Sequence, residues 1–167
     1  SICFRLLRAY GSLMNLRNPR IATDLDSKFM LKEVVDDLSG TDFGSDLEKF
    51  LKNGHGDDFD AKKLQREISK LKSSGLTASN YAQSTKKNHF LSQPFSLYQE
   101  KLQADNMLDF DDCLVECSRL LQLHPVLHFI KHVLVDEFQD TNDVQLQLVY
   151  ELAKRTVELP EDSANYG

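Results

Sequence analysis

The sequence predicts a mostly α-helical chain with one clear buried β-strand at about residues 132–136. Apolar residues recur at intervals of three and four along most of the chain, which places them on one face of a helix. Polar capping residues precede several of these stretches and glycines follow them, as is typical of helix starts and ends. The exception is Val133-Leu134-Val135, a wholly apolar and mostly β-branched run that is typical of a strand buried on both faces of a parallel sheet.

The sequence of the first half of the chain predicts five helices. Asp26 or Ser27 is expected to cap the second helix, and Thr77 to cap the fifth. Gly40 and Gly75 fall where the second and fourth helices should end. The inward faces are, in chain order, Cys3, Leu6, Leu7 and Tyr10; Leu31, Val34, Val35 and Leu38; Leu47, Phe50 and Leu51; Leu64, Ile68 and Leu71; and a short stretch through Tyr81.

The second half predicts three further helices around the buried strand. The strongest amphipathic stretch follows Asp109 and continues until His124-Pro125 interrupts it. Asn142 is expected to cap the last helix. The inward faces are Phe95, Tyr98 and Leu102; Phe110, Cys113, Leu114, Cys117, Leu120 and Leu121; and Val144, Leu148, Val149 and Leu152.

The composition is that of an ordinary soluble globular protein, with 41% apolar and 28% charged residues in 167. The sequence holds no apolar run near the roughly 18 residues that span a bilayer, so we expect no membrane contact. Cys3, Cys113 and Cys117 are an odd set without the spacing of a disulfide framework, which favours a reducing, intracellular compartment. Because a helical pattern starts directly after Ser1, we expect a piece of a longer protein.

Charge is divided unevenly along the chain. The net charge is −6, but residues 1–90 carry 15 basic and 12 acidic side chains, whereas residues 91–167 carry 5 and 14. A basic segment beside an acidic one predicts a polyanionic partner for one part of the chain only. Between residues 61 and 90 there is one acidic residue, Glu67, and seven basic ones: Lys62, Lys63, Arg66, Lys70, Lys72, Lys86 and Lys87.

A zinc site is one alternative use of the cysteines and histidines. His124, His128 and His132 fall at four-residue spacing, and Cys113 and Cys117 do the same just upstream. Pro125 is expected to start a new short helix, His132 already leads into the predicted strand, and both cysteines lie on the predicted apolar face. Buried thiols that pack as small apolar groups explain the two cysteines better, and we expect no metal here.

Two carboxylates follow the predicted strand directly. Asp136 and Glu137 would lie at its carboxyl end, which is where ligands bind in parallel sheets. One carboxylate there can bind the Mg²⁺ that bridges nucleotide phosphates, and its neighbour can accept a proton from the attacking water. On spacing alone the pair also fits a strand that simply ends in solvated charges.

The sequence around these carboxylates resembles a known family. The ten residues Val133-Leu134-Val135-Asp136-Glu137-Phe138-Gln139-Asp140-Thr141-Asn142 closely resemble motif II of the UvrD/Rep/PcrA class of superfamily 1 DNA helicases. The stretch Leu108–Leu114 resembles the acidic-aromatic segment that precedes the motif II strand, and Ser1–Arg8 resembles the tail of the Thr-Phe-His-Ser motif, with only the Ser retained. Residues 68–81 resemble part of the helical subdomain inserted into the first motor domain.

The resemblance implies a fold and a division into domains. The fold of the family is α/β, a P-loop NTPase with a RecA-like parallel sheet. Residues 1–25 and 107–167 would then belong to the first motor domain (1A), and residues 26–106 to the inserted helical subdomain (1B-like).

The resemblance also implies cofactors and site residues. ATP and Mg²⁺ would be bound, with Asp136 as the Mg²⁺ ligand, Glu137 as the catalytic base and Gln139 near the γ-phosphate. Single-stranded DNA and the duplex junction would be contacted by Ser1 and by the seven basic residues between 61 and 90, with Lys72 the strongest individual candidate. The basic residues of the helix around Ile68 also fit a solvated helix face, since they alternate with its inward residues.

The resulting hypothesis is a fragment of an ATP-dependent 3′–5′ DNA helicase that unwinds duplex DNA in repair or recombination. We expect a nuclear location, with the bacterial cytoplasm as the alternative. The sequence contains neither a Gly-x-x-x-x-Gly-Lys-Ser/Thr phosphate loop nor a Gly-Asp-x-x-Gln segment, so we expect the chain to be inactive alone. The alternative function is a non-catalytic helical module that binds nucleic acid or acts as an adaptor.

Overall fold

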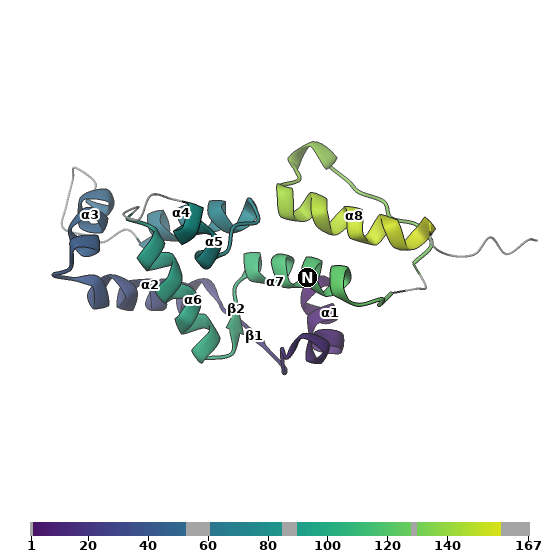
Figure 1. Ribbon diagram of the computed structural model, residues 1–167, viewed down its shortest axis with the longest axis horizontal. Helices are drawn as coiled ribbons and strands as arrows, with labels where there is room; N and C mark the ends of the chain where they lie inside the picture. The colour runs from purple at the N-terminus through teal and green to yellow at the C-terminus, as the bar shows by residue number, and fades with distance from the viewer. Residues whose placement is uncertain (1, 53–60, 85–89, 128–129, 158–167) are drawn as a thin grey trace, which may run out of the picture.

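Two helical lobes joined by a short sheet make up the computed structural model, which describes residues 2–52, 61–84, 90–127 and 130–157 (Figure 1). The α2–α6 lobe contains α2 (Asp24–Leu38), α3 (Asp42–Leu51), α4 (Ala61–Ser73), α5 (Ala78–Ser84) and α6 (Ser92–Ala104). The α7 lobe contains α1 (Ile2–Tyr10), the 3₁₀ turn η1 (Gly11–Met14), α7 (Phe110–Leu123), the 3₁₀ turn η2 (Phe138–Asp140) and α8 (Asp143–Val157). The strands β1 (Arg20–Ile21) and β2 (Met107–Leu108) lie between the lobes.

Each lobe has its own hydrophobic core, because the apolar stripes of its helices face one another. In the α2–α6 lobe, Leu31, Leu64 and Phe95 are fully buried among residues of α2, α4 and α6. In the α7 lobe, Leu7 of α1 and Leu120 of α7 are buried together. The two clusters share no residue, so most of the apolar burial in each lobe is independent of the other. The mostly helical prediction is confirmed.

The chain crosses between the lobes twice, once through each strand. β1 leads into the α2–α6 lobe and β2 leads back, and the two pair in parallel with Arg20 opposite Met107. The pairing is extended by two hydrogen bonds of 2.9 Å, from Arg20 N to Asn106 O and from Ala22 N to Leu108 O. The two segments that connect the lobes are therefore hydrogen-bonded to each other through β1 and β2.

Among the described residues, side-chain caps set the starts of five helices. Thr41 Oγ1 accepts from Gly44 N at 3.1 Å at α3, and Thr77 Oγ1 accepts from Asn80 N at 3.1 Å at α5, as predicted. Asn142 caps α8 as predicted, since its Oδ1 accepts from Gln145 N at 2.9 Å while Gln145 Oε1 accepts from Asn142 N at 3.1 Å. The predicted cap of α2 is wrong by one turn. Thr23 is the cap, and Asp26 accepts from the Thr23 backbone N–H at 2.8 Å as the partner of a capping box. Asp109 and Asp112 form the same kind of box at α7.

The predicted buried strand at 132–136 is wrong in this structure. Residues 130–135 adopt neither helix nor strand, and Leu134 is 95% exposed. A strand buried on both faces needs neighbouring strands and covering side chains. The described residues place neither beside this segment, and the parallel sheet they form is that of β1 and β2. Of the parallel sheet that the α/β prediction expects, the described residues contain only these two strands.

One predicted face needs a smaller correction. Phe110, expected inside with the apolar face of α7, is 61% exposed because it lies in the first turn, at the edge of the lobe. Within the described part of the chain, no helix has the length and apolarity needed to cross a membrane.

Candidate functional site

The predicted nucleotide-site residues lie together in the loop before α8. Asp136 Oδ1 accepts a hydrogen bond of 2.9 Å from the backbone N–H of Glu137, and the side-chain amide of Gln139 donates to Glu137 Oε2. Glu137 has a φ of 48°, in the left-handed region, which turns the chain sharply at this residue. The turn gathers the carboxylates of Asp136 and Glu137 and the amide of Gln139 in one place.

Further hydrogen bonds lie within this loop. The hydroxyl of Thr141 donates to Phe138 O at 2.6 Å, and Asp140 N donates to Glu137 O at 2.9 Å. The capping box of Asn142 then starts α8 directly after the loop. The loop therefore has a defined shape although its side chains are exposed.

The carboxylate oxygens of this loop are suitable ligands for a magnesium ion. Mg²⁺ prefers oxygen ligands and usually takes one or two carboxylates, with waters and substrate phosphates in the other positions. Asp136 is exposed and keeps its Oδ2 without a hydrogen-bond partner among the described residues. The described residues hold no group of three or more His, Cys, Asp or Glu side chains that could hold a metal. A single carboxylate completed by water and phosphate is thus the arrangement that this loop supports.

The basic residues predicted to contact DNA differ in their surroundings. Lys62 is exposed on α4, with no side-chain partner among the described residues. Lys63 donates to Phe50 O at 2.6 Å and lies over the Phe50 ring, and Lys70 pairs with Glu67 at 2.6 Å. Arg66 donates to the carbonyl oxygen of Lys62 at 3.1 Å. Ser1, Lys86 and Lys87 lie outside the described residues.

A groove of about 560 Å³ runs between α2 and α4. It brings a further cation, Lys28 of α2, to the same surface as Lys62 and Arg66. The sequence prediction missed Lys28 because this residue lies outside the basic segment of 61–90. The residues that line the groove are Asp24, Leu25, Lys28, Lys62, Gln65 and Arg66.

Lys72 cannot contact DNA as predicted, because it is buried. The residue is 2% exposed, and its Nζ lies 2.7 Å from Asp109 Oδ2 and 2.8 Å from Asp112 Oδ1. The spacing of the sequence contained the signal: Lys72 lies four residues after Ile68 and eight after Leu64, on the inward stripe of α4. The assignment of Lys72 to a DNA-facing surface is wrong.

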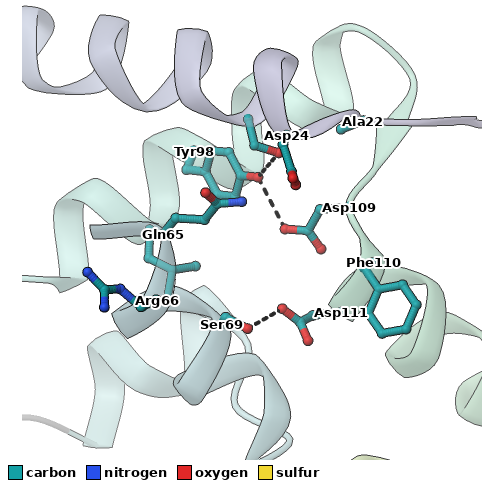
Figure 2. A pocket seen from close by; sticks show the side chains of 11 residues that line it. Ala22, Asp24, Gln65, Arg66, Ser69, Tyr98, Asp109, Phe110 and Asp111 are labelled. Carbon is teal, nitrogen blue, oxygen red and sulfur yellow. Dashed lines mark hydrogen bonds between the residues drawn. The ribbon is translucent and has the colours of Figure 1, made fainter. Parts of the chain in front are cut away.

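A cavity of about 290 Å³ lies beside this ion pair, where the two lobes meet. Figure 2 shows Asp109 turned toward Tyr98, and Asp111 turned toward Ser69. The hydroxyl of Ser69 donates to Asp111 Oδ2 at 2.6 Å, and the hydroxyl of Tyr98 lies 3.2 Å from Asp109 Oδ2. Side chains from α4 and α6 thus meet the carboxylates at the start of α7.

Burial raises the pKa values of several ionisable groups in this region. It raises the pKa of Asp112 to about 6, although Lys72 lies beside it, and it raises the pKa of Asp111. It also raises the pKa of Tyr98 well above its usual range, so the phenol keeps its proton at neutral pH. The cavity is therefore lined by groups whose charged forms are poorly solvated.

The cysteines of α7 are part of the core. Cys113 and Cys117 are buried, together with Cys3 of α1. Burial raises the pKa of Cys113 to about 12, so its thiol stays protonated at neutral pH. His124 is half-buried, His132 is exposed, and His128 lies outside the described residues. These surroundings agree with thiols that pack as small apolar groups.

Comparison with known proteins identifies the family. A family model described as the UvrD/REP helicase N-terminal domain matches residues 1–159. The ATP-dependent DNA helicase SRS2 of Saccharomyces cerevisiae is 35% identical over 163 residues, which are 92% of this chain and 14% of that protein. The ATP-dependent DNA helicase UvrD1 of Mycobacterium tuberculosis is 32% identical over 170 residues, 93% of this chain and 20% of that protein. The ATP-dependent DNA helicase Rep of Escherichia coli is 31% identical over 171 residues, 96% of this chain and 23% of that protein.

The motif II loop and this match together define the class of protein. The chain belongs to the UvrD/REP helicase family. It spans between 14% and 23% of the length of the three relatives just named.

Proposed function

We propose that the chain is part of the first motor domain of an ATP-dependent DNA helicase, together with an inserted lobe that contacts DNA. The observation that supports this most is the loop that gathers Asp136, Glu137 and Gln139 into one exposed polar cluster. The relatives named above are ATP-dependent DNA helicases. A 3′–5′ direction and a role in repair or recombination belong to the same proposal.

Each residue of the loop has a distinct proposed role. Asp136 would hold Mg²⁺ through its carboxylate. Mg²⁺, when bound there, would supply positive charge that stabilises the phosphates. Glu137 accepts a proton from the attacking water, and the amide of Gln139, which donates to Glu137, orients that carboxylate near the γ-phosphate.

The chain supplies only one part of this nucleotide site. Its sequence contains no Gly-x-x-x-x-Gly-Lys-Ser/Thr loop whose backbone could surround the phosphates. We infer that other parts of the protein supply this loop and the second motor domain, and that the chain alone does not hydrolyse ATP.

The division into domains follows the two lobes. Residues 1–25 and 107–167 belong to the motor domain and residues 26–106 to the inserted subdomain in this proposal. The separate cores support it, as do the two crossings at β1 and β2, which fall close to both boundaries.

DNA contact by the inserted lobe rests on charge and exposure. Lys62 and Lys28 are exposed on the groove between α2 and α4, where they can approach phosphates. Lys63, Arg66 and Lys70 would contribute after exchanging their present partners for phosphate oxygens. The same role is proposed for Ser1, Lys86 and Lys87. A nuclear location is supported by the SRS2 match, since that relative is from yeast.

The experiment is a substitution in the full-length protein. Glu137→Gln keeps the size of the side chain but removes the base, so ATP turnover should fall by about 10²- to 10⁴-fold while ATP still binds. Glu100→Gln, which changes an exposed acid of α6, is the matched control and should leave turnover unchanged. Retained turnover in Glu137→Gln would contradict the role of Glu137, whereas absence of turnover in the wild-type protein would favour a non-catalytic module.

A further inference from the structure

We propose that Lys72 is a positioning residue that locks the α2–α6 lobe onto the first turn of α7, so that both lobes move as one body. The inference rests on the proposed motor function of the α7 lobe. It concerns a side chain that touches neither the nucleotide loop nor the exposed basic surface of α4. Its basis is the buried cluster that joins the lobes.

The cluster is centred on one cation and two carboxylates. Lys72 of α4 donates to Asp109 at 2.7 Å and to Asp112 at 2.8 Å, and its side chain is 3% exposed. Asp109 is the N-cap of α7 and Asp112 is its partner in the capping box. The carboxylates that bind Lys72 are therefore the same ones that start the helix, and displacement of α4 would disturb the start of α7.

A second helix of the α2–α6 lobe, α6, also contacts these carboxylates. The hydroxyl of Tyr98 on α6 lies 3.0 Å from Ser27 Oγ on α2 and 3.2 Å from Asp109 Oδ2. The amide of Gln99, also on α6, donates to Asp112 Oδ1 at 3.3 Å. Side chains of α4 and α6 thus contact the two carboxylates of α7, and α2 is linked to them through Tyr98.

A second contact between the lobes involves Asp111, which lies between Asp109 and Asp112 in the sequence, and it can be followed in Figure 2. Ser69 of α4 donates to Asp111 Oδ2 at 2.6 Å, and the hydroxyl of Ser73 lies 3.5 Å from Asp111 Oδ1. Asp109, Asp111 and Asp112 are all held from the α2–α6 lobe. Phe110, the remaining side chain of this turn, is exposed between them, and its place on the surface is fixed by its neighbours.

Lys72 supplies the positive charge of this cluster. Among the described residues, Lys72 is the one cation that forms an ion pair with any of these three carboxylates, and it pairs with Asp109 and Asp112. A buried ion pair adds little net stability compared with apolar packing, but removal of one partner is strongly unfavourable and the geometry is specific. A residue of this kind fixes an arrangement more than it adds stability, which is what a connection between two separately packed lobes requires.

The test compares variants of the full-length protein. Lys72→Met fills the space of the side chain without its charge, and Lys49→Met, on α3 with a 73% exposed side chain and outside the proposed nucleotide and DNA contacts, is the control. We expect Lys72→Met to unwind duplex about three- to thirtyfold more slowly at saturating ATP, the range for loss of a coupling residue, with its KM for ATP unchanged. The slope of DNA affinity against salt should stay unchanged, because Lys72 gives no contact to phosphate.

Hydrogen exchange gives a readout that does not depend on helicase activity. Amides of the first turn of α7 should exchange faster in Lys72→Met than in the wild-type protein, and their exchange rates should be unchanged in Lys49→Met. The double variant Lys72→Met/Asp112→Asn should lose no more unwinding activity than Lys72→Met alone, since both substitutions break one connection.

Two results would overturn the inference. Wild-type unwinding together with unchanged exchange in Lys72→Met would show that the lobes need no such connection. A salt slope that falls by about one would instead show a phosphate contact. If the wild-type protein itself neither hydrolyses ATP nor unwinds DNA, the proposed function fails, and the hydrogen-exchange comparison still decides the role of Lys72.

Discussion

The phenol oxygen of Tyr98 lies 3.0 Å from Ser27 Oγ, although the two residues are 71 positions apart in the sequence. The same oxygen lies 3.2 Å from Asp109 Oδ2. One hydroxyl group thus links α6 to α2 within one lobe and to the start of α7 in the other. Both Tyr98 and Ser27 are buried, so neither can replace this partner with bulk water.

Removal of this hydroxyl should destabilise the protein without changing its packing. Tyr98→Phe keeps the ring in the core but leaves Ser27 and Asp109 without the phenol. A buried group that loses its partner costs about 1 to 3 kcal/mol in free energy of unfolding. Urea unfolding measures the difference. Tyr150→Phe, at an exposed position of α8, is the control and should stay within about 0.5 kcal/mol of wild type.

Asp112 should make stability depend on pH in mildly acidic solution. Burial raises its pKa from 3.8 to about 6, so between these values the folded protein binds more protons than the unfolded chain. The contribution of Asp112 to the free energy of unfolding therefore falls as pH rises from about 4 to about 6, and is constant above that range. Asp111, whose pKa is also raised, contributes with the same sign.

The variant Asp112→Asn isolates this effect, because it removes the titrating carboxyl. Urea unfolding at several pH values between 4 and 7 should show a shallower decline in stability for the variant than for wild type. Parallel curves would mean that Asp112 is not the group that titrates.

The helices were predictable because their signals are local. Stripes such as Leu64 and Ile68 identify the inward face of α4, and the capping box of Asn142 identifies the start of α8. The nucleotide-loop residues Asp136, Glu137 and Gln139 are close in sequence, so their proximity was also predictable. The strands β1 and β2 are two residues long, too short to show any periodicity.

The surroundings of Lys72 and of the 132–136 segment depend on distant parts of the chain. Lys72 lies on the inward stripe of α4, but only the folded arrangement places Asp109 and Asp112 opposite it, 37 and 40 residues away. An apolar run such as Val133-Leu134-Val135 has the same pattern whether or not other strands lie beside it. The local sequence therefore cannot decide whether such a run is buried.

The side chain of Asn142, which caps α8, should contribute to the stability of the folded protein. Asn142→Ala removes the oxygen that accepts from Gln145 N, which should lower the free energy of unfolding by about 1 kcal/mol. Urea unfolding tests this value. Asn80→Ala, at an exposed position inside α5, is the matched control and should cause no loss, since Ala favours a helix interior. Equal effects of the two substitutions would contradict the capping role.

The groove between α2 and α4 makes a separate prediction about DNA binding. Lys62 and Lys28 are both exposed there, so each should neutralise a phosphate and release counterions when the full-length protein binds DNA. Lys62→Ala and Lys28→Ala should each weaken binding to any sequence and reduce the slope of log affinity against log salt by about one. The double variant should reduce it by about two, because the side chains lie on different helices and act independently. Lys49→Ala on α3, where the lysine is exposed but pairs with Asp46, should leave the slope unchanged. A slope that is the same in all variants would exclude this groove from the DNA interface, whereas a loss confined to Lys62→Ala would restrict the interface to α4.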